Sequence, residues 1–180
     1  MTLRSRCVAL CAAMLMGACA VVPATSDVAV ADTLTGRLAV RVEASEGAQA
    51  RSVSAAFDLR GNASTGRLNL ATPLGSVLAQ ARWAPGSVVL ATPQGETQFP
   101  DLDALTREVL GESLPVAALF DWLRGRPWPG AASTATVAPA DAGFEQLGWI
   151  VNLARFDESW VAARRDAAPT VTVRARIDRP

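Results

Sequence analysis

The chain has 180 residues with 17 basic and 17 acidic side chains, so its formal net charge is zero and nothing in its composition favours nucleic-acid binding. All the basic residues are arginines, and histidine, lysine and tyrosine are missing, which removes most of the usual general acids and bases of enzymes. The length suits one ordinary domain.

The first 18 residues have the pattern of a lipoprotein signal peptide. Arg4 and Arg6 supply a positive start, Val8 to Met16 form a short apolar run, and Cys19 directly follows two small residues. We therefore predict that residues 1–18 are removed and that Cys19 carries a covalent lipid. The alternative is a general secretory signal, which would leave a soluble periplasmic protein with a free thiol.

Residues 19–32 are predicted to form the acylated N-terminus and a flexible tether, because they contain Pro23, small residues and little charge. Cys7 and Cys11 would leave with the signal peptide, so the mature chain could form no internal disulfide and no Cys/His zinc site. The apolar run before Cys19 is shorter than the ~20 residues that span a membrane, so attachment would depend on lipid. The folded domain is expected to cover residues 33–180.

Alternating apolar and polar residues predict a series of β-strands from Leu34 to Phe99. Each strand has one apolar and one polar face, the period expected in an antiparallel sheet with one wet side. Turns are predicted at Gly61-Asn62, at Pro85-Gly86 and around Pro93 to Gly95. The predicted strands cover residues 34–43, 52–60, 67–70, 76–83, 87–91 and 96–99.

The period changes to that of helices after residue 100. We predict one helix that follows the N-cap Asp101 and ends at Gly111, and a second that is capped by Ser113 and ends at Gly125. Pro115 falls in the first turn of the second helix, where its missing amide proton costs nothing.

An alanine-rich loop is predicted over residues 130–142, and strands return after it. One is predicted over Gln146–Leu153, with Trp149 on its apolar face and Gln146 on its wet face, and the last over Thr170–Ile177. The order of long sheet, two helices and further sheet predicts a mainly β, α+β fold. We expect a curved antiparallel sheet whose concave face is covered by the inserted helices.

The sequence lacks the G-x-S-x-G, P-loop and G-x-G-x-x-G motifs, so serine-hydrolase, nucleotide-driven and dinucleotide chemistry have no local support. Asp101 and Asp103 form a carboxylate pair, but their place at a helix start favours a role beside the helix dipole. We therefore expect no enzyme; a lipid-active hydrolase would need an unrecognised site without histidine.

Three tryptophans have two interpretations. Trp83, Trp122 and Trp149 fall on or beside apolar faces. They would either fill the core or line a cavity for an apolar ligand, and both roles require the same inward-facing positions.

Leu74 also has two interpretations. It lies between Pro73 and Gly75 in a tight connection between strands, where a polar residue is usual. Its side chain would either fold back onto the core or project into a membrane or a partner.

Four short motifs follow one another along the domain: Leu68-Asn69-Leu70-Ala71-Thr72-Pro73-Leu74-Gly75-Ser76, Leu114-Pro115-Val116, Trp122-Leu123-Arg124-Gly125 and Gln146-Leu147-Gly148-Trp149. Together with the lipidation signal, this ordered set resembles the LolB family of outer-membrane lipoprotein receptors over nearly the whole mature domain. Each motif alone is weak, whereas the set is fairly specific.

The resemblance implies an incomplete antiparallel β-barrel with an apolar interior that holds acyl chains. It also implies a receptor at the periplasmic face of the outer membrane. Such a receptor accepts lipoproteins from the periplasmic carrier LolA and inserts them into the membrane without nucleotide hydrolysis. A monomer with no cofactor other than the lipid on Cys19 is expected.

The resemblance assigns Leu74, with Pro73 and Gly75, to a loop that pushes delivered lipoproteins into the membrane. Apolar strand and helix positions form the candidate acyl-chain cavity, some of them on a movable lid made by the second helix. The candidate cavity residues are Phe57, Leu59, Leu68, Leu70, Trp83, Leu119, Trp122, Leu123, Trp149 and Val151, with Leu119, Trp122 and Leu123 as the lid.

The sequence departs from the family pattern at four places. Leu59 stands where the family often has tryptophan, Leu153 and Phe156 stand where tyrosines are common, and the chain ends at Pro180 without the usual terminal aromatic. These changes keep the surfaces apolar but remove hydroxyl and indole donors.

A competing function is that of an envelope-assembly or structural lipoprotein, which would use the same sheet to bind a protein partner. This alternative predicts a filled core.

Three arginines could form part of a docking surface for an acidic carrier. They lie on the wet faces of their strands, where ordinary solvation is the simpler interpretation of each: Arg37, Arg41 and Arg67.

Overall fold

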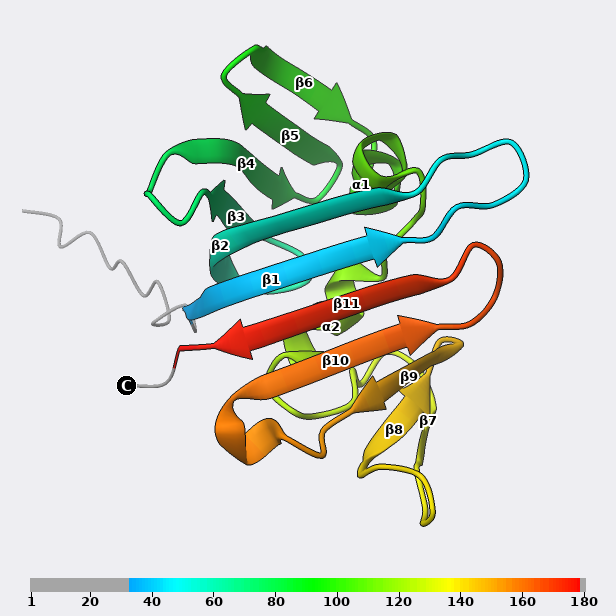
Figure 1. Ribbon diagram of the computed structural model, residues 1–180. Coiled ribbons are helices and arrows are strands. Elements are labelled where there is room, and N and C mark those ends of the chain that lie inside the picture. The colour runs from blue at the N-terminus through cyan, green and yellow to red at the C-terminus, as the bar shows by residue number, and fades with distance from the viewer. Residues whose placement is uncertain (1–32, 179–180) are drawn as a thin grey trace, which may run out of the picture.

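The computed structural model describes residues 33–178 (Figure 1). The predicted signal peptide over residues 1–18, the lipidation site Cys19, the tether over residues 19–32 and the terminal Pro180 lie outside the described residues. Among the residues described, no helix combines the length and the apolar character needed to cross a membrane.

The strands of the described chain form one antiparallel sheet, in the order β6-β5-β4-β3-β2-β1-β11-β10-β9-β8-β7. β1 pairs with both β2 and β11, so the beginning and the end of the domain meet in the middle of the sheet. The strands are β1 (Leu34–Val42), β2 (Arg51–Gly61), β3 (Gly66–Ala71), β4 (Val77–Ala84), β5 (Ser87–Thr92), β6 (Gly95–Phe99), β7 (Ser133–Ala135), β8 (Gly143–Gln146), β9 (Trp149–Asn152), β10 (Trp160–Arg165) and β11 (Val171–Ile177).

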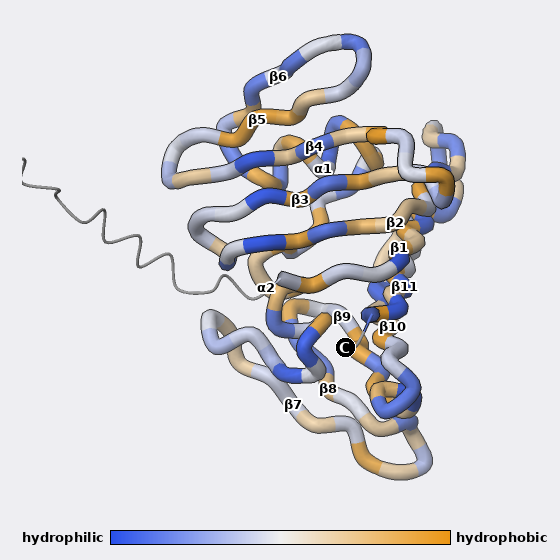
Figure 2. Tube along the Cα trace, turned by 90° about the vertical axis from the view of Figure 1, so that its left-hand side faces the viewer, coloured by the Kyte–Doolittle hydropathy of each residue, from blue (hydrophilic) through white to orange (hydrophobic). Residues whose placement is uncertain are grey.

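The sheet is open, since β6 and β7 form its two edges and do not pair with each other. It curves around α1 (Leu102–Leu110) and α2 (Val116–Trp122), which lie on one side of it (Figures 1 and 2). The predicted fold class is therefore confirmed: a mainly β, curved antiparallel sheet that forms an incomplete barrel, with two inserted helices over its inner face.

α1 begins and ends as the sequence predicts. The Asp101 carboxylate accepts a hydrogen bond of 2.7 Å from the Ala104 amide, and Gly111 takes a left-handed conformation while its amide donates to the Arg107 carbonyl. Leu105 and Leu110 are buried on the side that faces the sheet.

α2 differs from the prediction at its start. Pro115 is the N-cap, no side chain caps the helix, and Ser113 lies too far upstream to reach its first free amides. The Pro115 carbonyl instead accepts from the Ala118 and Leu119 amides, so backbone bonds alone close the first turn. The helix ends at Trp122, earlier than the predicted stop at Gly125, and hydrogen-bonded turns continue to Gly125, where φ is 75°.

The C-terminal strands differ more. Leu147 and Gly148 have φ values of 54° and 75°, as in a two-residue type I′ hairpin turn, so the single predicted strand over Gln146–Leu153 is wrong. The turn places Gln146 opposite Trp149, and both side chains are buried. β7 also lies inside the predicted loop over residues 130–142, and β10 falls where no strand is predicted.

The core lies between the inner face of the sheet and the helices, and it has two parts. One contains Trp122 of α2 with Trp149 and Val151 of β9. The other contains Phe57 of β2 and Trp83 of β4 with residues of α1.

Candidate functional site

An apolar cavity of about 160 Å³ lies between the inner face of the sheet and the two helices. Strands β1, β2, β3 and β11 supply one wall, and α1, α2 and the link between the helices supply the other. The lining residues are Leu38, Val40, Val53, Phe57, Leu59, Leu68, Leu70, Leu105, Thr106, Val109, Leu110, Leu114, Val116, Leu119, Phe120, Leu123, Val173 and Ala175.

Thr106 is the one polar residue in that lining, and its hydroxyl is already used. It accepts a hydrogen bond of 3.0 Å from the Leu114 amide and donates one of 3.2 Å to the Asp103 carbonyl. The lining therefore offers dispersion contacts and no unpaired side-chain hydrogen-bonding group, which suits a hydrocarbon ligand and disfavours a polar one.

The volume of the cavity is below the roughly 300–1,000 Å³ typical of pockets that hold drug-sized ligands. It is comparable with apolar cavities that remain dry and accept a benzene-sized molecule. To hold a complete acyl chain, the walls would have to move apart.

The structure brings six of the ten candidate cavity residues together around this space. Four of them lie on the inner face of the sheet, in β2 and β3. The other two lie on α2 and directly after it. These six are Phe57, Leu59, Leu68, Leu70, Leu119 and Leu123. The other four, Trp83, Trp122, Trp149 and Val151, do not line the cavity.

Trp83 packs in the core instead. Its indole N–H donates a 3.0 Å hydrogen bond to the Asn62 carbonyl, and its ring meets Phe120 edge-on with 5.6 Å between centroids. The hydrogen bond fixes the indole toward the β2–β3 turn and away from the cavity.

Trp122 and Trp149 belong to a second, solid region. Their ring centroids are 5.9 Å apart, Phe144 packs 6.5 Å from Trp122, and Val151 is fully buried beside them. Of the three predicted lid residues, Trp122 packs in this region and does not line the cavity, whereas Leu119 and Leu123 form part of the cavity wall.

Gln146 holds this region together. Its Oε1 accepts from the Trp122 indole N–H at 2.7 Å and from the Trp128 amide at 2.9 Å, and its Nε2 donates to the Trp128 and Ala131 carbonyls at 2.8 Å each. Sequence reasoning placed Gln146 on the wet face. A glutamine inside an aromatic-rich motif was the signal that could have indicated a buried hydrogen-bonding centre.

The β3–β4 connection is a tight hairpin loop that displays Leu74. The Thr72 amide donates to the Ser76 carbonyl and the Gly75 amide to the Thr72 carbonyl, both at 2.9 Å, and Gly75 has φ of 86°. These are features of a three-residue loop in which glycine supplies the left-handed residue and proline the first turn position. Leu74 at the tip is 96% exposed, so its side chain does not fold back onto the core.

Two further apolar side chains extend this exposed tip. Val77 is 61% exposed and Leu78 is 40% exposed at the start of β4. The three together give the hairpin an apolar end, whereas scattered single apolar residues are ordinary on protein surfaces.

Polar links hold the two helices to the sheet around the cavity. Arg51 at the start of β2 donates to the Glu108 and Val109 carbonyls at the end of α1. Glu112, between the helices, pairs with Arg165 of β10 at 2.8 Å in a partly buried position. Within residues 33–178, no group of three or more acidic or cysteine side chains could hold a metal ion.

Comparison with known proteins gives a consistent result. The family described as "Outer membrane lipoprotein LolB" matches residues 33–178. The outer-membrane lipoprotein LolB of Bordetella pertussis is 36% identical over 155 residues, covering 81% of this chain and 76% of that protein. The LolB proteins of Bordetella petrii and Cupriavidus metallidurans are each 35% identical, covering 95% and 98% of this chain and 89% of each relative.

Proposed function

Because the chain belongs to the LolB family of outer-membrane lipoproteins, we propose that it accepts lipoproteins from the periplasmic carrier LolA, shields their acyl chains in the apolar cavity, and inserts them into the outer membrane. The family consists of lipoprotein-localisation proteins of the outer membrane and not of enzymes. The resemblance found in the sequence is confirmed over the whole described domain.

The observation that carries the proposal is the cavity with its hydrocarbon lining. Each methylene of an acyl chain contributes about 0.8 kcal/mol when it is buried away from water, so a lipoprotein cannot cross an aqueous gap unshielded at a useful rate. A lining with no unpaired polar side chain provides that shielding without a competing hydration cost.

Transfer in this proposal runs downhill, since the sequence has no nucleotide-binding motif. The carrier binds the acyl chains least tightly, the cavity binds them more tightly and the bilayer most tightly. Loading requires the cavity to widen, and the wall assigned to move is the one formed by α1 and α2, whose lining side chains are apolar apart from Thr106.

Photocrosslinking tests the cavity. A photoreactive residue at Leu70 or Leu119, which line the cavity, should label the acyl chains of a bound lipoprotein, whereas the same residue at Val151 or Val161 in the packed region should not. Equal labelling, or none at the cavity positions, would contradict the proposal. Displacement of a fluorescent fatty acid gives a second measure, because a structural lipoprotein that binds a protein partner should take up none.

We assign Leu74 to release into the membrane. Leu74→Glu should fold and accept cargo from the carrier normally but release it into liposomes at least tenfold more slowly, because a charge in the apolar part of a bilayer costs roughly 3 kcal/mol. Val137→Glu is the matched control, since Val137 is also an exposed apolar residue, 77% accessible, on the β7–β8 loop. Unfolding of Leu74→Glu, or equal loss in both variants, would refute a specific role for Leu74.

Membrane attachment is assigned to the lipid on Cys19. The Cys19→Ala protein should appear in the soluble fraction, whereas the unchanged protein should stay with salt-washed membranes. If Cys19→Ala still fractionates entirely with membranes, the lipid is not what holds the protein there.

A further inference from the structure

The outward face of three adjacent strands, β1, β11 and β10, carries arginines without acidic residues, and the nearest strand acid, Asp58 on the neighbouring β2, is paired with Arg60. Arg37 and Arg41 lie on β1, Arg174 and Arg176 on β11, and Arg164 on β10, and none of these strands contains aspartate or glutamate. We call these five side chains the arginine face. It contrasts with a chain whose total charge is balanced.

The strand register concentrates this charge. Arg37 pairs directly with Arg176, and Arg41 and Arg164 flank the same residue of β11, Thr172. Like charges directly opposite each other on neighbouring strands destabilise a sheet, so folding alone gives no reason for this arrangement.

Much of this charge is not neutralised by the protein. Arg41 pairs with Glu43 at 2.7 Å and Arg164 pairs with Asp166, both acids standing just beyond the ends of the strands. Within residues 33–178, Arg37 and Arg174 make no ion pair. They are free to bind an anion from outside.

The arginine face also has space for an anion. Arg174 is flanked by Ala39 on β1 and Ala162 on β10, whose short side chains leave space on either side of the guanidinium. An open hollow of about 570 Å³ lies there, lined by Arg41, Arg164 and Arg174 and, at one end, by Glu43, which is already paired with Arg41. Guanidinium groups bind phosphate oxygens in a planar, two-bond geometry, so a phosphate-bearing headgroup fits this chemistry.

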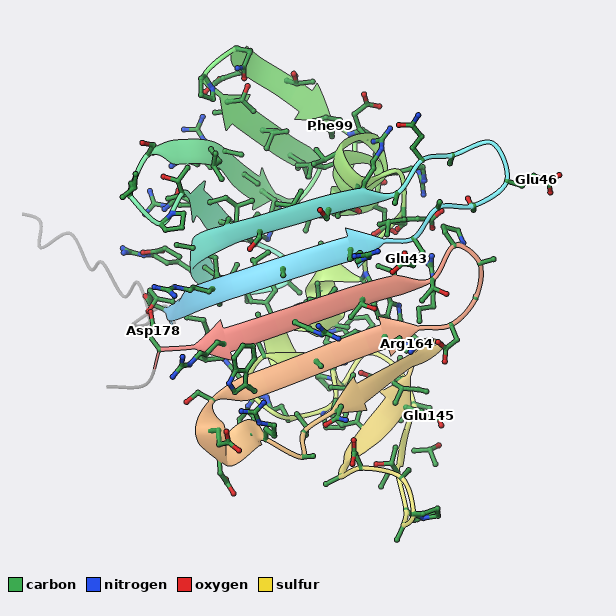
Figure 3. The ribbon with its side chains drawn as sticks, in the orientation of Figure 1. Glu43, Glu46, Phe99, Glu145, Arg164 and Asp178 are labelled. Atoms are coloured by element: carbon green, nitrogen blue, oxygen red, sulfur yellow. The ribbon has the colours of Figure 1, made fainter. Side chains whose placement is uncertain are left out.

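Another feature lies on the same side of the molecule. Figure 2 shows the β3–β4 connection on the side where β1, β11 and β10 are seen end-on. The labelled acids Glu43 and Asp178 lie at opposite ends of the three-strand surface in Figure 3. The arginine face is thus bounded by an acid at either end and adjoined by the apolar tip.

We infer that the arginine face docks on the anionic phospholipid surface of the membrane that holds the anchor, an inference that rests on the proposed function. Docking in this orientation would bring the Leu74 tip toward the bilayer and leave the helix-covered side, with the cavity behind it, facing away. The charge of this face would suit an anionic membrane or an acidic protein, and the neighbouring apolar tip of Leu74, Val77 and Leu78 favours the membrane.

Vesicle sedimentation tests the inference. The mature chain with Cys19→Ala, which carries no acyl chains, is mixed with vesicles of phosphatidylcholine alone or with added phosphatidylglycerol. It should bind the anionic vesicles and be released by salt, because screening weakens exposed charge interactions. Equal binding to both vesicle types would overturn the inference.

Matched variants locate the binding surface. Arg37→Gln with Arg174→Gln should reduce the partition coefficient by about 25-fold, since one arginine near an anionic surface contributes roughly a five-fold change. Arg107→Gln with Arg126→Gln removes the same charge from α1 and from the segment after α2, and should change it little. Lysines at positions 37 and 174 should restore binding, and circular dichroism checks that every variant folds.

Two results would decide against the arginine face. Equal losses in the two glutamine pairs would show only a net-charge effect. Normal vesicle binding by Arg37→Gln with Arg174→Gln, combined with poor acceptance of lipoproteins from the carrier, would make the face a protein-docking surface. Failure of the proposed function is distinct from these, because it would leave vesicle binding intact and abolish acyl-chain crosslinking at Leu70 and Leu119.

Discussion

Trp122 and Leu119 lie one turn apart on α2, and their surroundings differ in kind. Trp122 is surrounded by the rings of Phe144 and Trp149, and its indole N–H is bonded to Gln146. Leu119 lines an apolar cavity, as does Leu123. The same short helix therefore joins a filled region to one that contains free space.

This difference assigns two roles to α2: one side holds the helix in place, and the other forms a cavity wall that can move. Hydrogen bonds to a buried amide are directional, and they hold α2 in one position at Trp122. Aliphatic contacts are non-directional, so the leucine side of the helix can change its contacts at little cost. The molecule thus combines a rigid anchor with a wall that can yield, as an acyl-chain receptor requires.

The largest expected effect is at Gln146. Gln146→Leu should lower the free energy of unfolding by about 3–4 kcal/mol, because it leaves the buried Trp122 indole and the Trp128 backbone without partners. Urea denaturation followed by tryptophan fluorescence measures this. Gln80→Leu is the control, with one 2.6 Å bond to Asn69 at a part-buried site and an expected loss below about 1 kcal/mol. Similar losses in the two variants would remove the distinction between the regions.

A matched pair of valine substitutions compares the regions directly. Val151→Phe should destabilise the protein by about 2–3 kcal/mol, because the ring has no space in a filled core. Val53→Phe adds the same ring to the cavity wall, so it should cost less than about 1 kcal/mol but prevent uptake of a fluorescent fatty acid. If Val53→Phe still takes up the fatty acid, the cavity is not its binding site.

The link between the helices should show a smaller effect. Glu112→Gln breaks the ion pair with Arg165, whose side chain is 20% exposed, and should cost about 1 kcal/mol. It should also speed fatty-acid entry, measured by stopped-flow fluorescence, because the movable wall loses a link to β10. Glu96→Gln, which breaks an exposed pair with Arg82, should change neither quantity. Unchanged entry in Glu112→Gln would show that this link does not restrain the wall.

The smallest effect is expected at a surface ion pair. Hydrogen bonds from Arg155 lower the pKa of Glu158, so the pair stabilises the fold above the pKa that Glu158 has in the unfolded chain. That contribution is lost as the pH falls through the lowered pKa. Both side chains are well exposed, so Arg155→Gln should leave the melting temperature at pH 7 almost unchanged. A large change in the melting temperature of Arg155→Gln would mean that surface ion pairs contribute as much to stability as the packed interior around Trp122.

The sequence predicts the first six strands and α1 closely because their signals are local. Alternation marks the half-exposed strands, and Asp101 and Gly111 mark the ends of α1. Gln146 was misplaced because its burial depends on Trp128 and Ala131, which reach it only in the folded chain. A polar residue in an alternating strand pattern is ordinarily interpreted as exposed.

In the candidate site, too, some features could be predicted from the sequence and others depended on the folded structure. Pro73 and Gly75 predict the turn that carries Leu74, whereas the exposure of its side chain was implied only by the family resemblance. The separation of cavity leucines from core tryptophans does not follow from the strand pattern, because both groups occupy inward positions. It depends on where α2 docks, and Trp122 determines that through a hydrogen bond to a residue 24 positions later.

The open sheet leaves two strand edges, β6 and β7, that neighbouring molecules could pair with. A barrel that stays open keeps two unpaired strand edges, and proteins held together on a membrane surface meet often enough for such edges to join. β6 carries Glu96 and is followed by Pro100, while β7 is three residues long and fully exposed. Charge, proline and short length are the features that prevent strand addition between molecules. The sheet can therefore stay open without leading to aggregation.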